Sequence, residues 1–309
     1  MTSASPALTC YRHPGRETHI LCTRCDRPIC PDCMTEASVG FQCPECISEG
    51  RSTQRQARTW FGGTAAGQLG YVTITLIALN VLVFLANLVV SRGASFGNGL
   101  FGGGTILHQW GAVHGPDVVI AGFPCADNPD AICQVTESAP GIDSGAYYRL
   151  VTSMFLQYGA IHLAVNMWAL WILGRQLEMV LGPLRFAALY LIGGLGGSVA
   201  AYLFAPESLT AGASGAIFGL FAAFILVLRK LGRSLAPIMP IILINVFITF
   251  AVPNISVAGH LGGFLTGGLV AAGLVYAPQN KRTPVQVAVA ASVIALLLLT
   301  TMVSSVIRS

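Results

Sequence analysis

The sequence predicts an all-α polytopic membrane protein with a small cysteine-rich module in front of its first span. Of the 309 residues, 54% are hydrophobic and only 10% are charged, and the mean hydropathy is +0.68. A soluble domain of this size carries more charge, so most of the chain is expected to lie in lipid. Polar sequence precedes the first apolar run, so we expect no cleavable signal peptide and a first span that acts as the targeting signal.

The apolar runs define the expected helices. About 20 helical residues cross a hydrocarbon core roughly 30 Å thick. Seven such runs are present, at roughly 71–90, 152–173, 184–204, 211–228, 235–252, 257–276 and 285–307. All 13 Asp and Glu residues fall outside them. Seven transmembrane helices are therefore predicted.

The basic residues predict the orientation of the chain and exclude one class of partner. One side of the predicted membrane receives the basic N-terminal region together with Arg175, Arg185, Arg229, Lys230, Arg233, Lys281 and Arg282. The other side receives Arg92, Arg149 and Arg308. By the positive-inside rule the N-terminus is cytoplasmic, and the C-terminus and the 91–151 loop are extracytoplasmic, in what we expect to be a prokaryotic plasma membrane. The net charge of +4 is spread over termini and short loops, so no nucleic-acid partner is expected.

The 91–151 loop contains a pair of cysteines and ends in an amphipathic run. Cys125 and Cys133 lie in a compartment where thiols oxidise, so either a disulfide or two free thiols fits the sequence. The closing run AYYRLVTSMF predicts ordered structure at the outer interface.

The N-terminal module carries four pairs of potential metal ligands. They are Cys10 and His13, Cys22 and Cys25, Cys30 and Cys33, and Cys43 and Cys46. Two tetrahedral zinc ions need eight such donors, and the short spacing between the second and third pairs favours joining the first pair with the third and the second with the fourth. Disulfides are the alternative, but a cytoplasmic location favours zinc.

This segment resembles the B-box type of zinc finger. Residues 1–50 are assigned to it and residues 51–70 to a linker. Because all eight ligands come from the protein, the two zinc ions are expected to be structural, and the module is expected to bind a cytoplasmic protein or to regulate the rest of the chain.

Polar side chains inside the predicted spans are the strongest functional signal. His162 with Asn166, Ser214 and His260 lie on three runs that all enter from the outer side. At 1.5 Å per residue, Ser214 and His260 lie about 5 Å below that interface, where water can reach them, and His162 lies somewhat deeper. Intramembrane polar groups are costly, and their shared depth favours a common site.

A serine and a histidine at one depth predict nucleophilic chemistry. Glycines follow both residues at four-residue spacing, so their helices can approach closely and the Ser214 hydroxyl can reach a neutral His260 imidazole that takes its proton. Gly212 leaves room for a substrate backbone. No carboxylate lies in the spans, so a dyad is predicted, with Phe218 placed one turn below Ser214 to stack on His260.

His162 and Asn166 are spaced i, i+4 on one helix face, which suits two donors to an oxyanion. Both patterns also have ordinary structural interpretations. A serine between glycines often serves packing, and His with Asn at this spacing often joins helices.

Residues 71–276 resemble the rhomboid family of intramembrane serine proteases. The resemblance assigns the family's GxSG to Gly212–Gly215, its His before GxxxG to His260, its HxxxN to His162 and Asn166, and its stacking aromatic to Phe218. Tyr148 and Arg149 match the family's Trp-Arg pair only in part, and Glu178 in GRQLE is similar to a structural motif after the second helix.

The resemblance implies a six-helix rhomboid-like core over 71–276. The last apolar run is additional to this core, so residues 277–309 are assigned to a linker and a seventh transmembrane helix. The resemblance also implies a serine endopeptidase that needs no catalytic cofactor and cuts single-span membrane proteins near the outer face, at small residues. Two alternatives are an inactive relative that binds membrane helices, which would lack the serine or histidine, and a small transporter, which would show inverted repeats and a midplane site.

Overall fold

The computed structural model describes residues 8–53, 57–65, 69–91, 104–119, 124, 125, 128–132, 138–253 and 255–308. The chain divides into two compact units, Met1–Ala57 and Arg58–Ser309. Cys125 and Cys133 lie where side chains are not described, so the choice between a disulfide and two thiols falls outside the described residues.

The first unit is built from very short elements. Strand β1 (Leu8–Thr9) pairs with β2 (Glu17–Thr18), β3 (Thr35–Glu36) pairs with β4 (Phe41–Gln42), and α1 (Pro44–Thr53) closes the unit. Six of the cysteines and Ile29 form its buried core. So small an apolar core rarely holds a chain folded by itself, which points to a metal as the organising element.

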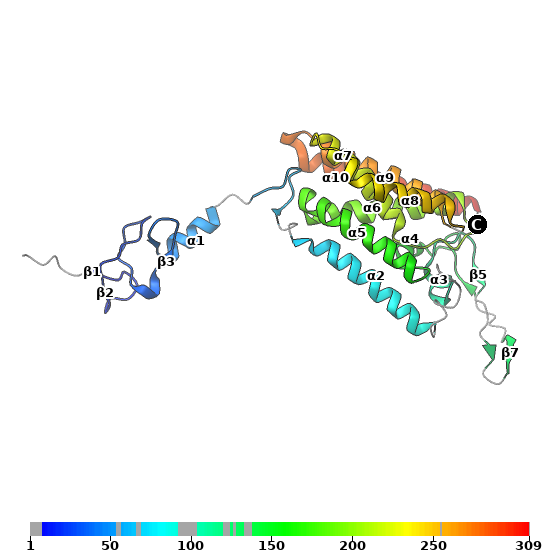
Figure 1. The fold of residues 1–309 in the computed structure, drawn as a ribbon, viewed down its shortest axis with the longest axis horizontal. Helices are drawn as coiled ribbons and strands as arrows, with labels where there is room; N and C mark the ends of the chain where they lie inside the picture. The colour runs from blue at the N-terminus through cyan, green and yellow to red at the C-terminus, as the bar shows by residue number, and fades with distance from the viewer. Residues whose placement is uncertain are drawn as a thin grey trace, which may run out of the picture. The chain divides into compact units, whose positions relative to one another are not determined.

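The second unit is a helical bundle with one helix in each of the seven predicted runs (Figure 1). These helices are α2 (Tyr71–Val90), α5 (Ala160–Leu181), α6 (Pro183–Phe204), α7 (Ser214–Lys230), α8 (Met239–Ala251), α9 (Val257–Tyr276) and α10 (Arg282–Arg308). Four helices of the described chain are long and apolar enough to cross a membrane, and a fifth span results if a bent pair is counted as one. The shorter α7 and α8 complete the bundle, which confirms the predicted all-α polytopic architecture.

The second predicted span begins later than the sequence indicates. The first residues of the predicted run instead complete α4 (Arg149–Thr152) and form a 3-10 helix (Ser153–Phe155), and the chain bends by 92° between this pair of helices and α5, which begins at Ala160. The turn contains Gln157, which is 1% exposed and hydrogen-bonded to two asparagines. The predicted order of the AYYRLVTSMF run is confirmed, but the run lies at an angle to the span instead of forming its first turns.

Glu178 corrects the expectation that every acidic residue lies outside the helices. It is fully buried in the last turns of α5, where its carboxylate accepts hydrogen bonds from the Val72 and Thr73 backbone N–H groups and the Thr73 hydroxyl at 2.7–2.9 Å. The first N–H groups of a helix lack acceptors within the helix, so the Glu178 carboxylate supplies the acceptor for two of these groups at the start of α2. A search for uncharged runs therefore ends this helix too early.

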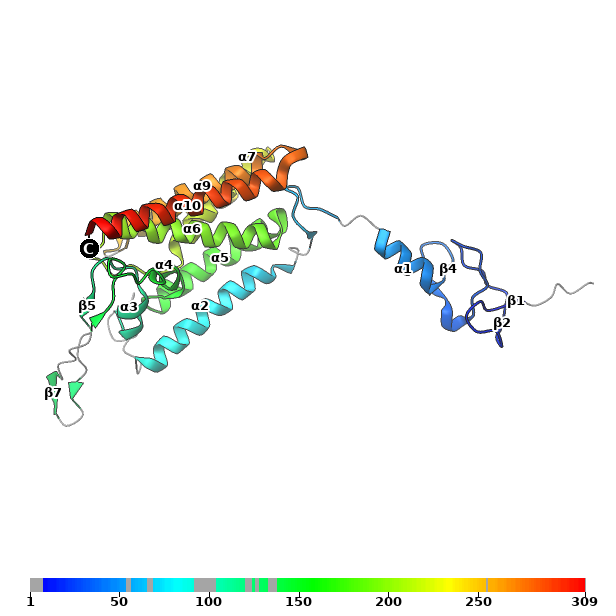
Figure 2. The same cartoon turned by 180° about the vertical axis from the view of Figure 1, so that it is seen from behind.

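Helices α6, α7 and α9 are in backbone contact. A Cβ added to Gly263 would lie 2.0 Å from the Gly215 carbonyl oxygen, and one added to Gly267 would lie 2.3 Å from the Gly219 Cα atom. The predicted close approach of α7 and α9 through their glycines is thus confirmed. Figure 2 shows α10 running alongside α9 and α6 on the outside of this group.

Described parts of the segment between α2 and α5 pack at one end of the bundle around Arg149, whereas Figure 1 shows β7 (Asn128–Ile132) projecting away from the helices. The segment contains α3 (Ile106–Gly111) and the strand pairs β5 (Val118–Val119) with β8 (Ser138–Ala139) and β6 (Pro124–Cys125) with β7. The fully buried Arg149 guanidinium donates to the carbonyls of Gln109, Ala112 and Pro140 at 2.7–2.8 Å. Because one guanidinium donates to three carbonyls, Arg149 holds these parts of the segment together beside the ends of the helices.

Candidate active site

Ser214 is the first residue of α7, and the chain before it fixes its position. The Gly212 N–H donates to the Ser153 carbonyl at 2.9 Å, and the φ of Gly212 is +140°, a conformation that favours glycine. A Cβ at Gly212 would also lie 2.8 Å from the His162 ring. Because α7 starts here, the Ser214 backbone N–H lacks an acceptor within the helix, so hydroxyl and N–H are both presented at the helix start.

Ser214 and His260 are in direct contact. The Ser214 Oγ and the His260 Nε2 are 2.7 Å apart, and they come from α7 and α9. His260 is 7% exposed, and the Phe218 ring stacks on its imidazole with a centroid separation of 4.2 Å and an interplanar angle of 14°. The structure thus brings together the three residues that the sequence selected for the nucleophile, the base and the stacking aromatic.

The other ring nitrogen of His260 has a partner that sequence reasoning missed. The His260 Nδ1 and the Thr249 Oγ1 on α8 are 2.8 Å apart, and that hydroxyl also donates to the Asn245 carbonyl at 2.7 Å. A hydroxyl has one proton. Since Thr249 gives its proton to the carbonyl, its oxygen accepts from Nδ1–H, which leaves Nε2 to accept the Ser214 proton.

His162 and Asn166 both border the cavity beside Ser214. The Tyr158 backbone N–H donates to the His162 Nδ1 at 3.3 Å, so the proton of a neutral His162 lies on Nε2, the ring edge close to Gly212. Asn166 donates to Gln157 at 2.8 Å, and Gln157 donates to Asn80 at 2.9 Å, all three being buried. This buried amide chain fixes the side chain of Asn166, and sequence spacing gives no sign of Gln157.

Two stacked rings, His108 from α3 and Tyr158 from the turn before α5, lie beside His162. The His108 and Tyr158 rings stack with their centroids 4.2 Å apart, and the centroids of the Tyr158 and His162 rings are 6.4 Å apart. Burial lowers the pKa of His108 to about 4, so this imidazole is neutral at physiological pH. The stack adds no positive charge beside the serine.

A cavity of about 840 Å³ lies beside Ser214, and its volume falls within the range of sites that enclose a ligand. Its walls include Ser214, His260, His162, Asn166 and Gly212. Among the described residues, the hydrogen-bond partners of the His260 ring are a serine and a threonine and include no carboxylate. The arrangement can therefore generate a serine nucleophile with a hydroxyl, instead of a carboxylate, behind the base.

Comparison with known proteins places this part of the chain in a family. Residues 144–278, which include α4 to α9, match the model of the Rhomboid domain. This part of the chain is a rhomboid domain. The family and the apolar helices together make the chain an integral multi-pass membrane protein. The match starts at residue 144, so α2, α10 and the cysteine-rich unit lie outside it.

Several curated relatives are similar to part of this chain. The protein named Rhomboid protease GluP from Bacillus subtilis (strain 168) is 42% identical over 141 residues, which are 43% of this chain and 27% of that protein. RHOMBOID-like protein 2 from Arabidopsis thaliana is 38% identical over 139 residues, 43% of this chain and 44% of that protein. Inactive RHOMBOID-like protein 8 from the same plant is 33% identical over 144 residues, 44% of this chain and 41% of that protein. The chain thus spans less than half the length of each.

Outside the rhomboid domain, the first unit contains two groups of metal-ligating side chains. One is Cys10, His13, Cys30 and Cys33, the other is Cys22, Cys25, Cys43 and Cys46, and the donor atoms of each group lie within 4.8 Å of one another. The predicted interleaved pairing of the four ligand pairs is therefore confirmed. Every one of these cysteines is free of disulfides.

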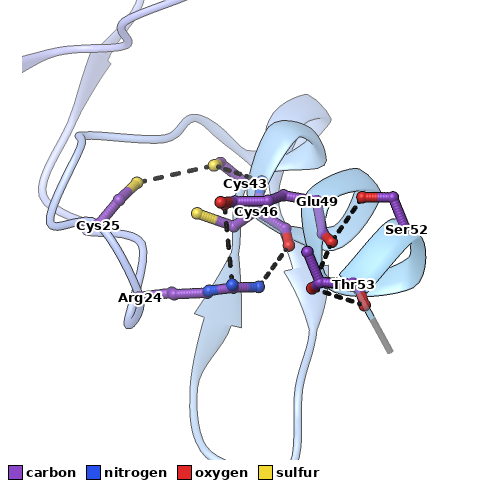
Figure 3. Close-up of polar contacts among 8 residues, drawn as sticks. Arg24, Cys25, Cys43, Cys46, Glu49, Ser52 and Thr53 are labelled. Carbon is purple, nitrogen blue, oxygen red and sulfur yellow. Dashed lines mark hydrogen bonds and ion pairs between the residues drawn. The ribbon is translucent and has the colours of Figure 1, made fainter. Parts of the chain in front are cut away.

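The donor spacing fits a tetrahedral zinc ion. Zinc with bonds of about 2.3 Å to sulfur holds two sulfurs about 3.8 Å apart. The Cys25 and Cys43 sulfurs are 3.7 Å apart, and the His13 Nδ1 lies 3.3 Å from the Cys30 and Cys33 sulfurs. Figure 3 shows Cys25, Cys43 and Cys46 of the second group beside α1, where the Arg24 guanidinium donates to the Cys46 carbonyl at 2.9 Å and approaches the Glu49 carboxylate. Both groups could hold zinc.

Proposed function

We propose that the protein is an intramembrane serine endopeptidase that cleaves transmembrane segments of single-span membrane proteins by a Ser214–His260 dyad. The 2.7 Å contact between the Ser214 hydroxyl and the His260 Nε2, inside a membrane bundle, is the observation that carries the proposal. The name of the Bacillus relative, Rhomboid protease GluP, supports the same reaction class.

The reaction starts with transfer of the Ser214 proton to His260 as the oxygen attacks a peptide carbonyl. The negative charge on the resulting tetrahedral oxygen is stabilised by the Ser214 backbone N–H, the His162 Nε2–H and the Asn166 amide. His260 then gives its proton to the leaving amine, and the acyl group remains on Ser214. Water, activated by His260, releases it and restores the hydroxyl.

The substrate class follows from access to the cavity. A transmembrane helix hides its carbonyls in its own hydrogen bonds, so the segment to be cut must unwind, and small or helix-breaking residues favour this. By the positive-inside rule, the basic loops predict a cytoplasmic N-terminus and an extracytoplasmic C-terminus, and with that orientation Ser214 faces the extracytoplasmic side. We therefore expect cleavage near that face.

The rival function is that of an inactive relative that binds membrane helices without cutting them. An aligned relative carries the word inactive in its name, so membership of the family does not by itself assign activity. The hydrogen-bonded dyad and the stacked Phe218 favour catalysis, because binding alone requires neither.

Covalent labelling by a fluorophosphonate serine probe tests the proposal. The probe is expected to modify Ser214 in the purified wild-type protein and to label His260→Ala at least about a hundredfold more slowly, because the hydroxyl then has no base. Peptide mapping identifies the modified serine. Equal labelling of His260→Ala, or modification of another serine, would contradict the proposed dyad.

Thr249→Val tests the hydroxyl behind the base. Valine keeps the shape of threonine but cannot accept from the His260 Nδ1–H, so the imidazole loses the preference for the productive tautomer. We expect kcat to fall about 10- to 100-fold with little change in KM, and Thr249→Ser to restore most of the activity.

Thr301→Val provides the matched control for this variant. Thr301 on α10 is also buried, and its hydroxyl donates to its own helix at the Leu297 carbonyl. The activity of Thr301→Val is expected to stay at the wild-type level. A loss of kcat in Thr249→Val that serine fails to rescue would show that Thr249 serves packing alone.

For the first unit, we propose that the two ligand groups hold two structural zinc ions and that the folded module binds a cytoplasmic protein. The fit of the donor spacing to zinc supports the metal. With four protein ligands at each ion no position is left for substrate water, so the zinc stabilises the module and takes no part in hydrolysis.

A further inference from the structure

Three arginines from separate segments meet at the end of the bundle where α6 and α10 begin. Arg58 precedes α2, Arg185 lies in the first turn of α6, and Arg282 is the first residue of α10. A Cβ added to Gly62 would lie 2.9 Å from the Arg282 Cδ and 3.7 Å from a terminal nitrogen of Arg185. The charges of Arg58 and Arg282 both act on Arg185. The guanidinium groups thus surround one turn of the chain.

The hydrogen bonds of these guanidinium groups go to neutral acceptors. Arg58 donates to the Gly62 carbonyl and Arg282 to the Trp60 carbonyl, both at 3.2 Å, and Arg185 donates to the Gln286 side chain at 2.7 Å. A guanidinium has five N–H donors, so each retains donors for another ligand.

Among the described residues at this end of the bundle, no carboxylate pairs with the three arginines. The ion pairs found among the described residues, Arg16–Asp32 and Arg24–Glu49, both lie in the first unit and not in the bundle. The segments 57–70 and 277–290 contain no Asp or Glu, and Glu178 is already hydrogen-bonded at the start of α2. Three positive charges without an anion repel one another, and a bound anion would remove this repulsion.

Exposed apolar side chains flank the arginines. Trp60 is 74% exposed and Leu184, next to Arg185, is 81% exposed, whereas Phe61, which follows Trp60, is buried in the bundle. Val287, one turn into α10, is 62% exposed. Exposed tryptophan and arginine at the ends of membrane helices lie at the level of the lipid headgroups, with apolar side chains facing the acyl region.

We infer that Arg58, Arg185 and Arg282 form a binding site for the phosphate of an anionic phospholipid, whose acyl chains lie against Leu184 and Val287. The guanidinium forks suit phosphate oxygens, and the adjoining apolar residues suit a lipid better than a free anion. The site lies where the segment from the first unit joins the bundle, so a bound lipid would also fasten the turn Thr59–Gly63. It involves none of the groups that carry the proposed hydrolysis.

Binding of phosphatidylglycerol to the full-length protein tests the inference. The protein is placed in phosphatidylcholine nanodiscs, phosphatidylglycerol is titrated in, and bound lipid is counted by native mass spectrometry. We expect saturable retention, with a half-saturating fraction about fivefold higher in Arg185→Gln and in Arg58→Gln, since each loses one of three charges. Arg58 is exposed and bonds only to one carbonyl among the contacts described, so its variant keeps the test valid if Arg185→Gln folds poorly.

Lys281→Gln is the matched control, because it removes the same charge one residue before Arg282 from an exposed side chain. Its lipid retention should equal that of the wild type. An equal loss in Lys281→Gln would show only general attraction to a negative surface and would overturn the site. So would the absence of saturable retention, or displacement of the lipid by millimolar inorganic phosphate, which would assign the site to a free anion.

Discussion

Replacement of Ser214 by alanine is expected to abolish cleavage of a model single-span substrate. The change removes the oxygen that attacks the carbonyl, while the Phe218–His260 stack and the Thr249 contact persist. Loss of a catalytic serine leaves only the contributions of substrate binding and the oxyanion donors, so we expect activity to fall by at least about four orders of magnitude. The measurement is the rate of product formation by purified protein in proteoliposomes, read on gels.

Ser208→Ala is the control for this experiment. Ser208 lines the same cavity but contacts neither ring nitrogen of His260, so this variant should cleave at the wild-type rate. Thermal unfolding of both variants should match the wild type, because Ser214 is half-buried and Ser208 is exposed, and removal of either hydroxyl costs little stability. Undiminished cleavage by purified Ser214→Ala would eliminate the proposed mechanism.

Removal of zinc is expected to unfold the first unit. A structural zinc site contributes about 10–16 kcal/mol to folding in small zinc-binding peptides, far more than so small an apolar core can supply. Elemental analysis of the full-length protein should find about two zinc ions per chain. After chelation, proteases should cut within residues 8–53 at least about a hundredfold faster, while the bundle stays intact.

Two histidines in the first unit allow a proposed zinc ligand to be compared with a histidine outside both ligand groups. His13 belongs to the first ligand group, whereas the exposed His19 belongs to neither group. We expect His13→Ala to retain about one zinc ion and His19→Ala to retain about two. Absence of zinc from the wild type, or two zinc ions in His13→Ala, would refute the assignment.

Much of the architecture is predictable because lipid imposes simple rules. Length and apolarity place a helix in every predicted run, and Ser214, His260 and Phe218 come together because their spacing along α7 and α9 leaves few other ways to pack glycine-rich faces. The grouping of the cysteine pairs is predictable for a similar reason, because their separations along the chain limit how eight donors can be divided between two ions.

Residues whose partners come from distant helices were not predictable. Thr249 resembles any other threonine of an apolar helix until packing places its hydroxyl beside His260. Gln157 lies in an apolar stretch that predicts a helix. In the structure it lies in the break before α5, where its side chain is hydrogen-bonded to Asn80 and Asn166. A search for uncharged runs leaves Glu178 outside the predicted helix. Such a search takes no account of the backbone N–H groups at the start of α2, from which the Glu178 carboxylate accepts hydrogen bonds.

The backbone contact between α7 and α9 bears on how the protein responds to its surroundings. Membranes differ in thickness and in the lateral pressure that they exert on embedded helices. Where main chains touch, as at Gly215 and Gly263, compression has no side chain to deform and no gap to close. A change of host bilayer should therefore alter how readily a substrate enters, while the spacing between nucleophile and base stays constant.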